Sequence, residues 1–259
     1  MILFILFNQC GMSTEQWKKH PYQNKKTGFL NKLKKIGDVY IYNPIFYNFN
    51  QFNNDMINKK YNNKYNFTIK SLDLEKHCED VYSDVIEKYD EFILISHSTG
   101  YILAYKFAEL YEKNVKAIIN IDGGNTKEWY KMELGKNEMQ FFKKVKDKQL
   151  KSLFLNLKNN NQVYESVRVL EKVVRYNLFK QYNKLESQYS CPVYIFNNIG
   201  LKNELDMLDK FKYNNEFCEK NDAKSFYYIN KSDFLYFDID KQIINCINNL
   251  VANGIDNFT

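Results

Sequence analysis

Short apolar runs alternate with stretches of helical periodicity along this chain. A run of about four to eight apolar residues is typical of a strand that is covered on both faces, as in a parallel sheet. Six such runs predict strands, and they lie at 2–8, 39–42, 92–95, 115–121, 193–197 and 225–229. Because helical stretches separate them, the order predicts an α/β fold with a mostly parallel sheet of about six strands and right-handed crossovers.

The clearest helix signals flank the third apolar run. The stretch 71–89 carries its apolar residues on one face and carboxylates in its first turn, and Ser71 can cap it. A second stretch, 101–113, follows the third run almost at once with apolar residues at helical spacing. Three further stretches read as helical, at 125–187, about 204–219 and about 241–252.

The length of 259 residues suits one α/β domain with a sizeable core. We expect residues 1–124 to form the first part of that core and residues 188–259 to complete it. Residues 125–187 contain no convincing strand, so they are expected to form a helical insert between the two parts.

The charge of the chain is uneven. The net charge is +6, and residues 125–190 hold 14 Lys and Arg against 7 Asp and Glu. A basic segment can serve as an interaction module for nucleic acid or anionic lipid. These lysines are scattered over helical sequence without a nucleic-acid-binding motif, so we expect a solvated surface and no nucleic-acid partner.

Five widely spaced cysteines form no C-x-x-C pair. That pattern predicts reduced thiols and a cytoplasmic location rather than disulfides or a zinc site. Residues 1–7 are apolar but lack a basic start and are too short for a signal peptide. No segment approaches the roughly 20 apolar residues of a membrane-spanning helix, and no metal or organic cofactor is implied.

One pentapeptide, Ser96-His97-Ser98-Thr99-Gly100, stands between the third predicted strand and the helical stretch that follows it. A serine on a sharp strand-to-helix turn, with small residues two places before and after it, is the pattern of a nucleophile elbow. The small residues are needed because strand and helix backbones pass close together there. The motif points to nucleophilic chemistry at Ser98.

With this elbow, the order of elements resembles the α/β-hydrolase superfamily over essentially the whole chain, starting at that family's third strand. The insert lies where many members carry a helical cap. The turn Asn8-Gln9-Cys10-Gly11 resembles the family's first oxyanion turn, with its His-Gly replaced by Asn8-Gln9. The resemblance implies that Ser98 is the nucleophile and that the backbone N–H groups of Cys10 and Thr99 form the oxyanion hole.

The resemblance fails at the base and the acid. Asp233 stands where the family has its histidine, and Glu204 is the first carboxylate after the fifth predicted strand, later than the pattern requires. Asp122, after the fourth strand, is an acid position that some relatives use.

The three histidines of the chain do not fit the position of the family's base. We expect His97 to be structural and His77 to be solvated off the apolar face of its helix. His20 is the one histidine that could fold toward the site.

A serine hydroxyl needs a neighbouring base to act at neutral pH, and losing the histidine of a working triad costs on the order of 10⁶ in turnover. The sequence therefore predicts an impaired or inactive serine hydrolase, a pseudoenzyme that keeps a pocket for a small apolar acyl or ester ligand. One alternative is an active esterase or lipase-like enzyme in which Asp233, Glu204 or Asp122 is a rearranged partner of Ser98. The other is the basic interaction module. The sequence leaves the oligomeric state open.

Overall fold

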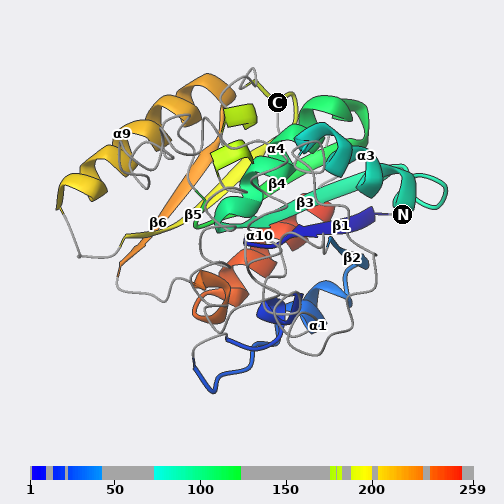
Figure 1. Ribbon diagram of the computed structural model, residues 1–259. Helices are drawn as coiled ribbons and strands as arrows, with labels where there is room; N and C mark the ends of the chain where they lie inside the picture. Colours follow the sequence, from blue (N-terminus) through cyan, green and yellow to red (C-terminus); the bar gives the residue numbers. More distant parts are fainter. Residues whose placement is uncertain are drawn as a thin grey trace, which may run out of the picture.

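All six strands of the computed structural model lie in one parallel sheet of order β2-β1-β3-β4-β5-β6 (Figure 1). The strands are β1 (Ile2–Phe7), β2 (Asp38–Tyr42), β3 (Glu91–His97), β4 (Val115–Ile121), β5 (Val193–Ile199) and β6 (Lys224–Ile229). The structure describes residues 2–9, 14–20, 23–42, 73–123, 176–178, 180–182, 188–199, 204–229 and 234–252. The predicted fold class is confirmed, and so is each of the six strands.

Helices cover both faces of the sheet. Figure 1 shows two helices on one face, α1 (Phe29–Leu33) and α10 (Asp240–Ala252). The other face carries α3 (Leu74–Val85), α4 (Tyr101–Leu110) and α9 (Glu204–Asn221). Each face has its own apolar core, because β1, β3 and β4 send alternate residues to the two sides.

The β3 strand is longer than its apolar run. β3 continues through Ser96 and His97, which are both fully buried although they are polar. Two flanking strands pair with this part of β3, so its backbone groups are satisfied, as burial of polar backbone requires. The ladder therefore carries the strand directly into the predicted elbow.

The α3 helix begins later than the sequence indicated. Asp73 is its N-cap, and its Oδ1 accepts hydrogen bonds from the backbone N of Glu75 at 2.9 Å and of Lys76 at 3.4 Å. Ser71, the cap expected from the sequence, lies outside the described residues. An aspartate at this position both satisfies free N–H groups and places negative charge at the positive end of the helix.

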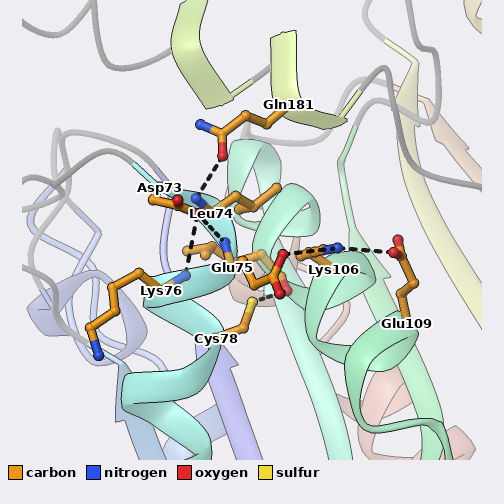
Figure 2. Close-up of polar contacts among 9 residues, drawn as sticks. Asp73, Leu74, Glu75, Lys76, Cys78, Lys106, Glu109 and Gln181 are labelled. Atoms are coloured by element: carbon orange, nitrogen blue, oxygen red, sulfur yellow. Dashed lines mark hydrogen bonds and ion pairs between the residues drawn. The ribbon is translucent and has the colours of Figure 1, made fainter. Parts of the chain in front are cut away.

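Part of the helical insert is described, at 176–178 and 180–182, and it packs onto the core. Tyr182 is buried, with its ring 5.2 Å from that of Tyr101 at the start of α4. Figure 2 shows Gln181 beside the N-terminus of α3, where its Oε1 accepts from the backbone N of Leu74 at 2.8 Å. The rest of the insert, where a cap over the site is expected, lies outside the described residues.

No helix among the described residues combines the length and the apolar character that crossing a membrane requires.

Candidate active site

The elbow connects β3 to α4 through a single 3-10 turn, Ser98–Gly100. Ser98 has a φ of 49°, in the left-handed region that non-glycine residues seldom adopt. It is partly exposed, whereas the other four residues of the pentapeptide are buried. The turn therefore presents the side chain of Ser98 at the carboxyl edge of the sheet and hides its neighbours, as the motif predicted.

Gly100 explains why this turn needs a small residue. A Cβ at Gly100 would meet the carbonyl oxygens of Phe7 and Asn8, the latter at 2.7 Å. The start of α4 thus lies directly against the end of β1. Ser96, at the other small position of the motif, is fully buried between its register partners Phe7 and Asn120.

Asp122 lies beside Ser98 at the carboxyl edge. His97 and Ile121 are register partners in the β3–β4 ladder, and Ser98 and Asp122 are the residues that follow them. Asp122 also has a left-handed backbone, with φ of 50°. Its Oδ1 accepts from the backbone N of Asn198 in β5 at 3.1 Å. Strained residues of this kind cluster at functional sites.

Of the other predicted site residues, the structure describes only some. Thr99 is buried in the turn directly after Ser98, so its role as an oxyanion donor stays a prediction. Cys10 and Asp233 lie outside the described residues. Glu204 begins α9 after β5, and its side chain also lies outside what the structure describes. Most of the basic segment 125–190 lies there too, so no contact bears on the interaction module.

Asn8, directly after β1, joins the end of that strand to the segment that carries Trp17. Its Oδ1 accepts from Trp17 Nε1 at 2.5 Å. The indole of Trp17 is fully buried, with its ring centre 4.8 Å from that of Tyr236 and 6.0 Å from that of Phe29. A short polar side chain thus fixes the end of β1 against the apolar core near α1 and α10.

Asn120 of β4 and Tyr105 of α4 form a buried pair of neutral polar side chains. Asn120 Nδ2 donates to the hydroxyl oxygen of Tyr105 at 3.1 Å, and both side chains are fully buried. Burial raises the pKa of Tyr105 well above its ordinary value, so the phenol stays protonated. Neither residue supplies a base for Ser98.

The prediction for His97 is confirmed and that for His77 is wrong. His97 is fully buried, with its ring 4.9 Å from Phe234 and 5.3 Å from Tyr236. His77 is only 6% exposed, and its Nδ1 lies 2.7 Å from the hydroxyl oxygen of Tyr42. The apolar stripe of α3 is wider than expected, because His77 lies one turn before Val81 and on the same side.

His20 is buried against the aromatic segment that precedes α10. It is 4% exposed, and its ring makes edge contacts with Phe234 at 4.9 Å and Phe237 at 5.1 Å between ring centres. An ion pair of 2.7 Å between Lys25 and Asp238 ties the same segment to the turn before α10. The imidazole of His20 thus lies beside Phe234, which directly follows Asp233 in the sequence. The ring of Phe234 also contacts His97.

Comparison with known proteins gave matches among solved structures only. No family model and no curated protein matches the chain. A monoacylglycerol lipase of Paleococcus ferrophilus is similar over 97% of this chain and 94% of its own, with 9% identity and a TM-score of 0.58. The RedJ thioesterase of Streptomyces coelicolor covers 96% of this chain and 89% of its own, with 11% identity and a TM-score of 0.51.

A third structure extends the range of activities. Est816, described as an enzyme that degrades N-acyl homoserine lactones, matches 96% of this chain and 93% of its own with 8% identity and a TM-score of 0.53. These likenesses, together with the sheet order and the elbow, show that the chain has the α/β-hydrolase fold. At such low identity they do not transfer a reaction, because one fold carries many activities.

Proposed function

We propose that this protein is a divergent serine hydrolase of the carboxylic-ester type whose turnover is severely impaired. Ser98 is the group that meets the ligand, and a pocket for a small apolar acyl or ester molecule is retained. The observation that carries the proposal is the elbow, in which a left-handed Ser98 is partly exposed between buried neighbours. The proposal includes the expected cytoplasmic location.

The impairment follows from the residue at the family's histidine position, which is Asp233. A carboxylate with an ordinary pKa of about 3.9 accepts a proton far less readily than an imidazole near 6.5. A triad without its histidine keeps only the contribution of the oxyanion hole and of ligand binding. That loss amounts to roughly 8 kcal/mol of transition-state stabilisation.

The three structural neighbours support the ligand class. Their names describe a lipase, a thioesterase and an enzyme that degrades N-acyl lactones. Each of these names refers to a ligand class that contains an acyl group. We therefore propose an acyl ester, held by its carbonyl near the N–H groups of Cys10 and Thr99, as the ligand at Ser98.

A fluorophosphonate probe, which reacts with activated serines, tests this function. We expect slow labelling that depends on Ser98 and is lost in Ser98→Ala, together with very weak turnover of a p-nitrophenyl acyl ester. Ser83→Ala is the matched control, because Ser83 is an exposed serine on α3. Labelling of the wild type as fast as that of an ordinary serine hydrolase would overturn the impairment, and no labelling even at high probe concentration would overturn the nucleophile.

An active ester hydrolase is the second candidate, and two observations favour it. His20 packs on Phe234, which follows the expected base position, and Ser98 and Asp122 each follow a member of the register pair His97–Ile121. In that case His20 or one of the carboxylates Asp122, Asp233 and Glu204 would assist Ser98.

Substitutions of the candidate partners separate the two functions. Under the impaired function, we expect His20→Gln, Asp122→Asn and Asp233→Asn to leave the slow labelling of Ser98 within about threefold of the wild type, since none acts as a base. His77→Gln is the control for removing a buried histidine. A loss of 100-fold or more in His20→Gln or in either carboxylate variant, with His77→Gln unchanged, would establish the active hydrolase instead.

A further inference from the structure

The outer edge of β6 is open among the described residues. β6 is the last strand of the sheet and pairs only with β5. Natural proteins usually block such an edge with charges, proline, a bulge or a covering element. The six residues of β6 contain no proline, no acidic residue and one lysine, Lys224.

Apolar side chains are exposed on this strand. Phe226 is 38% exposed and Ile229 is 61% exposed, and these are the exposed large apolar side chains of the described part of the chain. The strand at the other edge, β2, has no such residue and ends in the buried Tyr42. Exposed aromatic and aliphatic side chains on an unpaired strand edge mark an association surface.

A groove of about 560 Å³ lies beside this edge, between α10 and the β5–β6 face. Its floor is aromatic, with the ring of Phe196 stacked on that of Phe226 at 5.0 Å. Its helix wall carries the neutral amides Gln242, Asn245 and Asn249. The groove is open and nearly free of charge, so an apolar strand edge is compatible with it.

We propose that β6 pairs in antiparallel fashion with β6 of a second copy of this chain, around a two-fold axis at Phe226. The two six-stranded sheets then form one continuous sheet of twelve strands. A two-fold axis perpendicular to the sheet keeps the two faces in line, so opposed residues must project to the same face. An axis at Phe226 places Phe226 opposite its own copy, and Lys224 opposite Tyr228 of the second copy.

This register suits the side chains of the strand. Lys224 Nζ already lies 5.8 Å from the ring centre of Tyr194, so a lysine facing a tyrosine repeats a contact that the chain makes itself. The two copies of Lys224 lie at opposite ends of the paired segment and do not face each other. The strand thus pairs with a second copy of itself without bringing like charges together.

Sedimentation equilibrium over a range of concentrations tests the pairing. We expect the wild type to form dimers and Phe226→Lys to raise the dimer dissociation constant by at least 100-fold, since it places two lysines opposite each other at the axis. Asn31→Lys, on the exposed face of α1, adds the same charge far along the sequence from β6 and should leave the dimer intact. A wild type that is monomeric throughout, or a Phe226→Lys variant that remains as dimeric as the wild type, would overturn the proposal.

A disulfide tests the register. Opposed residues of an antiparallel pair have Cα atoms about 4.5 to 5.5 Å apart, within the range that a disulfide spans. Phe226→Cys should therefore yield an oxidised dimer linked between the two copies of position 226, identified by peptide mass spectrometry, whereas Ile229→Cys should not link to itself. A 229–229 link would refute the axis at Phe226. Circular dichroism checks that each variant is folded, so this result is independent of the proposed function.

Discussion

Ser98 holds a backbone conformation that costs free energy in a residue with a Cβ. Left-handed φ and ψ cost roughly 1–2 kcal/mol for an ordinary L-residue and little for glycine. Because the strand, the turn and α4 are fixed on both sides, the fold rather than Ser98 imposes this conformation. The strain is retained at the residue that carries the proposed chemistry.

We therefore expect Ser98→Gly to be more stable than Ser98→Ala by about 0.5–1 kcal/mol, although both lose the hydroxyl. Urea unfolding of the two variants measures the difference. Asp222, at the end of α9, has a φ of 48° and is exposed, so Asp222→Gly against Asp222→Ala is the matched pair outside the site. Equal stability within both pairs would show that the left-handed conformation carries no cost here.

Gly100 allows a second prediction at the elbow. A Cβ there would lie 2.7 Å from the carbonyl oxygen of Asn8 and would also press on Phe7. We expect Gly100→Ala to destabilise the protein by about 1–3 kcal/mol and to abolish Ser98 labelling, because α4 or the end of β1 must shift. At Gly28 the nearest atom to an added Cβ is Lys32 Cε at 3.7 Å, so Gly28→Ala should be tolerated. Similar effects at the two glycines would contradict the close approach.

Residues of the site that depend on local spacing could be predicted from the sequence. Ser98, Thr99 and Gly100 follow from one strand-to-helix turn, and Asp122 follows from the end of the next strand. His20 could not be placed, because its contacts with Phe234 and Phe237 join segments more than 200 residues apart. Local periodicity does not predict contacts between segments that are so far apart in the sequence.

At the scale of elements, the N-terminus of α3 joins two parts of the chain. Asp73 caps its first turn from within the same segment, and Gln181 accepts from Leu74 across the chain. On the same surface Lys106, from α4, lies 2.9 Å from a carboxylate oxygen of Glu109 and 3.9 Å from one of Glu75 (Figure 2). Polar contacts thus attach α4 and the end of the insert to α3.

Both acceptors should contribute to stability. We expect Asp73→Ala to cost about 1 kcal/mol, as loss of an N-cap does, and Gln181→Ala to cost about 1 kcal/mol through the lost hydrogen bond to Leu74. Gln181→Glu keeps an acceptor oxygen and adds negative charge at the positive end of the helix. Its free energy of unfolding should therefore be close to that of the wild type. Urea unfolding measures all three. If Gln181→Ala has no effect, the insert does not support α3.

The strands could be predicted from the sequence, but their order in the sheet could not. Continuous apolar runs identified β3, β4 and β5, because buried strands need apolar residues on both faces. The same argument identified β6 but gave no sign that it lies at an edge, since its exposed Phe226 and Ile229 read as core residues. An apolar edge strand looks buried in sequence, and only the topology distinguishes the two.

At the scale of the whole molecule, the elbow and the open strand β6 lie at different edges of one sheet. The elbow is at the carboxyl ends of the strands, and β6 is the last strand in the order. The carboxyl edge collects Asn8, Ser98 and Asp122 from the ends of neighbouring strands. The open side of β6 is two strands beyond β4. Pairing through β6 therefore leaves the elbow uncovered, so a dimer and an acyl ligand at Ser98 are compatible.

The buried thiols make the stability of the whole fold sensitive to alkali. Burial raises the pKa of Cys191 to about 12, whereas the same thiol in the unfolded chain ionises near 8.5 to 9. Between these values the unfolded state binds fewer protons than the folded state, so the free energy of unfolding falls as the pH rises. The contribution is fully present below about pH 8.5 and is lost progressively toward pH 12.

We expect Cys191 to contribute a slope of up to about 1.4 kcal/mol per pH unit in this range. Urea unfolding of the wild type and of Cys191→Ala between pH 8 and pH 10.5 measures it. The stability advantage of the wild type should shrink as the pH rises. Cys218→Ala, at a half-buried thiol on α9, is the control and should change the slope less. Stability curves of wild type and Cys191→Ala that stay parallel above pH 9 would mean that the thiol ionises normally in the folded protein.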